Sequence, residues 1–433
     1  MMAEELTNRL HLTNVSGWLK ISAMIKRRSL LDQHHLTERE QKSLTLLELI
    51  RQKGPLTRTE LSQGSGFNIV TISNYLKEFI DQGLVVERGF DVSTGGRKPV
   101  LVELNAKAGF VIGIDLGPMD HPNIVMTGLI TDLKGNIVHR IVKPRPILSM
   151  DQTLELTGEL IRDLIKSSPV DPKRIRGAAI GVSGVLDERA GTIRDTTRRG
   201  SRTSYLPLQT RWEQEFRMPV LIGNDASLAG YGEYRLGLDR PVDNMIYFYS
   251  DVGLSLIVHG HVYWGSCGSA GEVGVLMPST DDYLTWVKSP GFVLSKAWDL
   301  GVAAQARELI AEGHAAGLAT MVEGDPQSIT MDTVIQAAQA GDQLSKELIE
   351  NSALQFGIRI AYLVNLLNPD IVVIGGGIEK AGSMLLEPAW RSVKKYAYEE
   401  SASLVDVLPA QLGENAAALG AACWVIREVF VQA

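Results

Sequence analysis

Asn224 and Asp225 are adjacent and follow, after one glycine, a short apolar segment (residues 219–222) that is typical of a strand. The carboxylate of Asp225 could take a proton from a hydroxyl group, or bind that group through a charge-assisted hydrogen bond. The amide of Asn224 can both donate to a neighbouring hydroxyl and accept from it. A helix cap or a salt bridge is the structural alternative for Asp225. The pair predicts a site for a hydroxyl-bearing ligand.

A second candidate segment, residues 181–184, reads Gly-Val-Ser-Gly and ends a predicted strand over 176–182. Its glycines allow the backbone to approach a ligand closely, since they carry no side chain. The hydroxyl of Ser183 is a possible donor. We therefore expect Ser183 and Gly184 to lie in the same ligand site as Asn224 and Asp225.

Residues 37–107 carry the signals of three helices followed by two strands. Thr37 and Glu40 have capping-box spacing, and the helix that they begin should end at a Gly-Pro pair, residues 54–55. Thr57 should begin a short second helix through Leu61, followed by a turn at 64–66. A third helix is expected over about 68–82, with its apolar positions at Val70, Ile72, Leu76, Phe79 and Ile80. Strands over 84–86 and 99–104 complete the order of a winged helix-turn-helix.

The third of these helices would enter the major groove of DNA by its N-terminal half. The short polar or cationic side chains expected to reach bases or phosphates there are Asn68, Thr71, Ser73, Asn74 and Lys77. Asn74 is the residue that we expect on adenine. The loop over 93–98 is the predicted wing, where Arg97 and Lys98 would meet phosphates or the minor groove. The alternative is a small helical domain that binds protein.

Composition supports several domains and a DNA-binding head. A chain of 433 residues is longer than the chains that usually fold around a single hydrophobic core, so more than one domain is expected. Residues 1–107 hold 15 Lys and Arg against 12 Asp and Glu, which gives this segment a net charge of +3. The remainder has a net charge of −10, and the two add up to the total of −7, so the head is basic and the body acidic. Two cysteines and no apolar run of 18 residues indicate a soluble, cytoplasmic protein without disulfides or membrane segments.

The rest of the chain has the element order of a two-lobed α/β protein. Three strands, a helix and a further strand follow residue 108, and a similar order returns after residue 236. This order is typical of a duplicated ribonuclease-H-like lobe, as in actin-like sugar kinases. We expect a leader over 1–36, the winged helix over 37–107, and lobes over 108–235 and 236–433. The C-terminal helix could return to the first lobe.

Six motifs in one order resemble the ROK family, specifically its sugar-responsive repressor branch, which includes xylose and N-acetylglucosamine repressors. They are GGRKP at 95–99, GIDLG at 113–117, GVSGVLD at 181–187, GNDA at 223–226, GEVG at 271–274 and NPDIVVIGGG at 368–377. The resemblance implies that Asp225 stands where family kinases keep their base, and that Glu272 is a sugar ligand. A helix cap or salt bridge is the alternative for Glu272 as well. The resemblance also favours a homodimer or a dimer of dimers.

Departures from the family kinases concern the ATP phosphates and a zinc ion. Family kinases continue Asp-x-Gly with Gly-Thr, whereas Pro118, Met119 and Asp120 follow here and remove an amide donor and a hydroxyl. The second phosphate turn is replaced by Ser-Asp-Val-Gly-Leu at 250–254, which adds a carboxylate. Val275 stands where the family has a zinc-binding His, and 279–294 lacks cysteine, so we expect no metal and no cofactor.

These features lead to three hypotheses. The first is a transcriptional regulator, a repressor of carbohydrate genes, that binds an operator duplex and holds a sugar or sugar derivative in the ROK cleft without catalysis. The second is an ATP-dependent sugar kinase with a fused DNA-binding head. The third is a DNA-bound scaffold that has lost its ligand.

Overall fold

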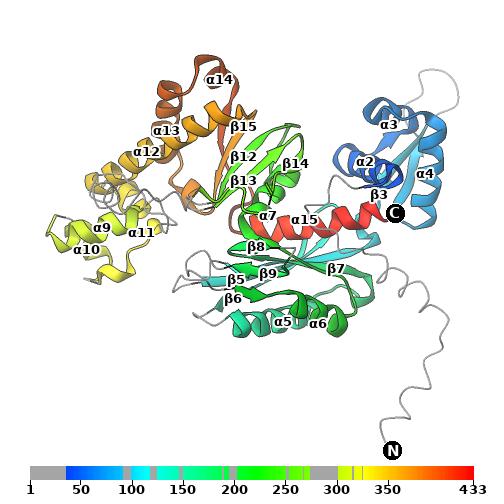
Figure 1. Cartoon of the computed structure of the whole chain (residues 1–433), viewed down its shortest axis with the longest axis horizontal. Coiled ribbons are helices and arrows are strands. Elements are labelled where there is room, and N and C mark those ends of the chain that lie inside the picture. Colours follow the sequence, from blue (N-terminus) through cyan, green and yellow to red (C-terminus); the bar gives the residue numbers. More distant parts are fainter. Residues whose placement is uncertain are drawn as a thin grey trace, which may run out of the picture.

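The computed structural model describes residues 36–90, 99–117, 124–145, 150–187, 190–194, 202–249, 253–266, 268–273, 301–314, 316–323 and 325–433. They form a small N-terminal head and a body of two lobes, each built on its own five-stranded sheet. The C-terminal helix α15 (Ala416–Val431) runs from between the lobes to the head (Figure 1).

The head consists of three helices and a three-stranded sheet. Their bounds are α2 (Glu38–Lys53), β1 (Leu56–Thr57), α3 (Arg58–Ser65), α4 (Ile69–Asp81), β2 (Val85–Phe90) and β3 (Val100–Leu104), with the strands in the order β1-β3-β2. The capping box at Thr37 and the cap at Thr57 are confirmed, since each side chain accepts from the backbone three residues on, and Glu60 completes a capping box at Thr57 as well. Asn68 caps α4 in the same way, so local signals set where each helix begins.

Two details of the head differ from the sequence-based expectations. Gly64 and Ser65 belong to α3, so the expected turn is reduced to Gly66, which has a left-handed φ of 73°. Val70 does not join the core beside Ile72 but is 72% exposed. Val70 matches the apolar pattern of the helix in type, but the turn of the helix directs its side chain away from α2 and α3.

The first lobe is built on a sheet with the order β11-β7-β4-β5-β6. β4 is antiparallel to β5 and parallel to β7, which is parallel to β11. Helices α5 and α6 pack on one face of this sheet. The elements are β4 (Phe110–Asp115), β5 (Ile124–Asp132), β6 (Ile137–Arg145), α5 (Met150–Ser167), β7 (Ile175–Val182), β8 (Val185–Asp187), β9 (Thr192–Arg194), β10 (Arg202–Ser204), α6 (Leu206–Phe216) and β11 (Val220–Asn224).

The second lobe repeats the plan with the order β14-β13-β12-β15-β16. Side chains along β12 point alternately to the two faces of this sheet. Ile246 and Phe248 pack with the outer helices of the lobe. Met245 and Tyr247 pack on the other face, with α7 and α15. The elements are β12 (Met245–Tyr249), β13 (Gly253–Val258), β14 (His261–Val262), α9 (Val302–Ala311), α10 (Ala316–Met321), α11 (Met331–Gln339), α12 (Gln343–Leu367), β15 (Ile371–Gly375), α13 (Ser383–Tyr396), α14 (Glu399–Leu404) and β16 (Asp406–Pro409).

Two helices, α7 (Asp225–Gly232) and α15, pack against each other between the two sheets. Their crossing depends on glycine, because a Cβ at Gly420 would lie 1.7 Å from the carbonyl oxygen of Leu228. A Cβ at Gly113 would likewise lie 1.9 Å from the carbonyl oxygen of Ala418, where α15 meets β4. The lobes therefore share a central helix pair rather than joining through one linker.

The head meets the body at a buried cluster of charges. Glu48 on α2 pairs with Arg51, whose Nε lies 2.6 Å from the carboxylate, and with Arg235 of the π-helical turn Glu233–Gly237. Arg51 also donates to the carbonyl oxygens of Lys134, at 3.3 Å, and of Arg235, at 3.2 Å. Because this turn continues α7, the head contacts the helical segment that begins at Asp225.

Candidate functional site

Three motifs of the first lobe lie in one row at the carboxyl ends of parallel strands. Asp115 of β4 is paired with Gly181 of β7, and Gly181 is paired with Gly223 of β11. In open α/β sheets, ligands bind in the crevice beyond this edge. The register therefore brings together segments that lie 108 residues apart in the chain, counted from Asp115 to Gly223.

Asn224 ends β11 and caps helix α7. Its Oδ1 accepts from the backbone N of Ser227 at 2.9 Å, and its Nδ2 donates to the carbonyl oxygen of Gly184 at 3.0 Å. Gly184 has a φ of 112°, and a Cβ there would lie 2.6 Å from the carbonyl oxygen of Arg194. Asn224 thus ties the Ser183–Gly184 turn to the start of α7, and one amide hydrogen remains for a ligand.

Asp225 is the first residue of α7 and is only 4% exposed. Ser183 Oγ donates to its Oδ2 at 2.5 Å, and the backbone N of Ala226 donates to its Oδ1 at 2.8 Å. Burial raises the pKa of Asp225 despite these two donors, because the charged form loses solvation. The structure brings Ser183 to Asp225 and leaves carboxylate lone pairs for a hydroxyl donor.

Glu272 reaches this site on a segment that contacts both lobes. A Cβ at Gly268 would lie 2.7 Å from the carbonyl oxygen of Leu186, and one at Gly271 would lie 2.0 Å from that of Leu254. Burial raises the pKa of Glu272, and the negative charge of Asp225 raises it further. Of the two predicted acids, Asp225 therefore acts electrostatically on Glu272.

Three further residues of the site were missed by sequence reasoning about ligands. Asp115 is 7% exposed and accepts from the backbone N of Gly117 at 2.9 Å and from the Tyr249 hydroxyl. Arg145, at the end of β6, is 1% exposed and its Nε donates to the carbonyl oxygen of Leu116 at 3.0 Å. Asp115 could have been found as part of the GIDLG motif, but no local signal marks Tyr249 or Arg145.

Asp115 should make the protein less stable as the pH rises towards neutrality. Burial, followed by repulsion from Asp225, raises its pKa from 3.8 to about 7. Between those values the folded protein keeps a proton that the unfolded chain has lost, so stability falls up to about pH 7 and then levels off. The full effect is about 4 kcal/mol at 1.36 kcal/mol per pKa unit.

Thermal melts of Asp115→Asn and wild type at pH 5 and pH 8 measure this effect. We expect the variant to gain stability relative to wild type as the pH rises, because asparagine carries no charge. Asp171→Asn, which changes an exposed cap, should show no such trend. Parallel pH curves for Asp115→Asn and wild type would contradict the assignment.

The predicted DNA-contacting residues of α4 divide into two groups. Asn74 and Lys77 are exposed, whereas Thr71 is half-buried. Asn68 Oδ1 accepts from the backbone N of Thr71 at 2.8 Å, and Ser73 Oγ donates to the carbonyl oxygen of Ile69 at 2.8 Å. Asn68 and Ser73 therefore have structural roles that leave them less free to reach bases. Arg97 and Lys98 lie outside the described residues.

Most of the predicted departures from the kinases also lie outside the described residues, namely 118–120, 250–252, Val275 and 279–294. The glycine turn after β15 is described, and Gly376 and Gly377 both have positive φ angles. The backbone N of Gly377 donates to Glu379 Oε2 at 2.7 Å. The carboxylate of Glu379 thus accepts a hydrogen bond from one of the backbone N–H groups that this turn could otherwise offer to a ligand.

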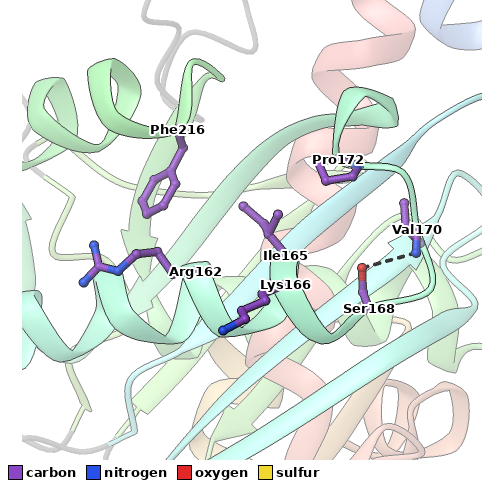
Figure 2. A pocket seen from close by; sticks show the side chains of 7 residues that line it. All are labelled: Arg162, Ile165, Lys166, Ser168, Val170, Pro172 and Phe216. Atoms are coloured by element: carbon purple, nitrogen blue, oxygen red, sulfur yellow. Dashed lines mark hydrogen bonds between the residues drawn. The ribbon is translucent and has the colours of Figure 1, made fainter. Parts of the chain in front are cut away.

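A shallow pocket lies elsewhere, on the helical side of the first lobe (Figure 2). It has a volume of about 390 Å³ and is lined by Arg162, Ile165, Lys166, Ser168, Val170, Pro172 and Phe216. These residues come from α5, α6 and the segment after α5. None of the predicted ligand residues lines it, so the site at the strand ends remains the candidate.

Comparison with known families identifies the body of the chain. The model of the ROK family matches residues 111–428, which cover nearly all of the two five-stranded sheets, all of α7 and most of α15. The chain belongs to the ROK family. It has the α/β fold of the family's sugar kinases and regulators.

Known relatives include repressors and a kinase. The xylose repressor of Caldicellulosiruptor bescii is 28% identical over 398 residues, covering 92% of this chain and 98% of the relative. The glucokinase of Halalkalibacterium halodurans is 30% identical over 257 residues, covering 58% of this chain and 76% of the relative. A ROK family transcriptional regulator homologous to the Escherichia coli MLC protein superposes with a TM-score of 0.68 at 19% identity, covering 91% of this chain and 96% of that structure. The repressor and the regulator thus match the head as well as the body.

In the part of the chain that the structure describes, no helix is long and apolar enough to span a membrane.

Proposed function

We propose that this protein is a transcriptional repressor of carbohydrate genes that binds operator DNA through its head and a sugar between its lobes. The observation that carries the proposal is the combination of a helix α4 with one exposed polar side in the head and a buried Asp225 that begins α7 in the body. Named repressors that match over nine-tenths of the chain support the same function.

The head, residues 37–107, has the element order and strand pairing of a winged helix-turn-helix, and α4 is its recognition helix. Asn74 and Lys77 are exposed on α4 and are available for an adenine and a phosphate, respectively. Asn68, Thr71 and Ser73 assist by shaping the first turns of this helix. The basic residues Arg97 and Lys98 of the wing add phosphate contacts.

The body holds the sugar through Asp225, Glu272, Asn224, Ser183 and Gly184. Carboxylates are suited to hydroxyl groups because they accept charge-assisted hydrogen bonds, and the neutral amide of Asn224 can donate a further hydrogen bond. The sugar acts as effector when it prefers one arrangement of the lobes, because a ligand shifts only states that it binds unequally. Two heads in a homodimer or a dimer of dimers would then change their spacing on paired half-sites.

A sugar kinase is the second candidate function, since a glucokinase is among the relatives and Asp225 is retained. We place it second because Asp115 is engaged by Tyr249 and by the backbone of Gly117. The sequence of both phosphate turns also departs from that of the kinases. ADP release over a panel of hexoses and amino sugars, abolished by Asp225→Asn, would reverse this ranking.

Fluorescence anisotropy on a promoter fragment from the protein's own operon tests DNA binding. We expect binding that weakens steeply with salt, because cationic side chains displace counterions from phosphates. Lys77→Ala should weaken binding and lower the slope of log K against log salt by about one. Lys346→Ala, which removes an exposed lysine of the second lobe, should leave both unchanged. Absence of salt-sensitive binding would overturn the proposal.

A further inference from the structure

The exposed side of α4 carries an apolar residue that the head itself does not use. Val70 is 72% exposed, whereas Ile72, Leu76 and Phe79 of the same helix are completely buried. A β-branched residue gains little in an exposed helix position, because its side chain loses rotamer freedom there. Val70 thus contributes little to the stability of the head.

Val70 shares one helical face with two polar residues. Val70, Asn74 and Lys77 are spaced by four and three residues, which places them on one side of a helix, and all three are exposed. The exposed acids of α4, Glu78 and Asp81, lie at its C-terminal end. The stripe therefore runs from an apolar group through an amide to a cation, and its N-terminal half carries no negative charge.

We propose that Val70 reads the C5-methyl group of a thymine in the operator. This inference rests on the proposed DNA-binding function and assigns part of its sequence specificity. The thymine methyl is the apolar group of the major groove, and aliphatic side chains contact it there. A second copy of the chain or a protein partner fits less well, because an amide and a cation continue the same stripe.

The geometry also places the thymine relative to an adenine. Four residues of α-helix rise about 6 Å, so Val70 and Asn74 are separated by about that distance along the axis. Base pairs stack at intervals of about 3.4 Å. The thymine read by Val70 is therefore expected within about two base pairs of the adenine read by Asn74.

Replacing thymine by deoxyuridine tests this contact, since the replacement removes only the methyl group. The full-length protein is first used to enrich duplexes from a random library. Anisotropy titrations then compare an enriched duplex with copies that carry deoxyuridine at single thymine positions. For wild type we expect deoxyuridine at one position per half-site to lower the affinity about threefold to fivefold. This is the fold-change that corresponds to burying one methyl group.

The variant Val70→Ala should lose this discrimination and bind the two duplexes with nearly equal affinity. Val86→Ala, which shortens a 39% exposed valine on strand β2, should discriminate as wild type does. Equal binding of thymine and deoxyuridine duplexes by wild type, or unchanged discrimination by Val70→Ala, would overturn the inference alone. Failure to enrich any duplex would overturn the proposed DNA-binding function, and this inference with it.

Discussion

Glu48→Ala is expected to destabilise the protein by about 3–5 kcal/mol, the usual cost of removing one partner from a buried ion pair. Its side chain is 12% exposed, and those of its partners Arg51 and Arg235 are 8% and 14% exposed. The substitution would leave two guanidinium groups at the head–body contact without their carboxylate. Urea titrations followed by far-UV circular dichroism measure the loss.

A surface pair provides the matched control for this variant. Glu155 and Arg211 are more than half exposed, so Glu155→Ala should cost at most about 1 kcal/mol. Burial alone would raise the pKa of Glu48, but Arg235 and Arg51 lower it overall. The stability that Glu48 provides is therefore present above its unfolded pKa and is lost as the pH falls through the lower folded value. A Glu48→Ala protein as stable as wild type would show that the cluster contributes nothing.

Asp225→Asn is expected to bind sugar about 10- to 100-fold more weakly and to melt at a higher temperature without sugar. Loss of a charge-assisted hydrogen bond costs about 1.5–3 kcal/mol of binding. The gain in stability follows from the raised pKa of this buried carboxylate, because the folded protein no longer has to bury its charge. Thermal melts with and without xylose, glucose or N-acetylglucosamine measure both effects, since a bound sugar raises the melting temperature.

These opposite effects separate ligand binding from a purely structural role. If Asp225 served only as a helix-end residue held by Ser183 and Ala226, its replacement would lower stability and leave sugar binding intact. Asp239→Asn changes an exposed acid at the start of the second lobe and should alter neither property. A protein whose melting temperature no sugar raises would support the scaffold hypothesis instead.

Much of the head was predictable because its signals are local. The capping boxes at Thr37 and Thr57 and the cap at Asn68 lie within three residues of the groups that they satisfy. Val70 was misjudged because periodicity identifies an apolar residue but not the side of the helix that packs. That side is decided by α2, α3 and the sheet together.

The candidate site was predictable in part, for a different reason. Asn224, Asp225, Ser183 and Glu272 were indicated by motifs, and the structure places Ser183 beside Asp225 and Glu272 within its electrostatic influence. Tyr249 and Arg145 carry no such mark, since each acts on Asp115 or its loop from a distant part of the chain.

The starts of the head helices, the main strand segments and the candidate acids Asp225 and Glu272 could be identified from the sequence alone, because caps, alternation and motif spacing act over a few residues. The position of Asp115, Gly181 and Gly223 at one edge of the same sheet follows only from the fold, since strand register pairs residues that are far apart in the chain. The ion pair between Glu48 and Arg235 also forms only in the folded protein, where Arg235 lies ten residues after Asp225 on the same helical segment. Buried charges need partners, and a linear sequence does not show which partners folding will bring.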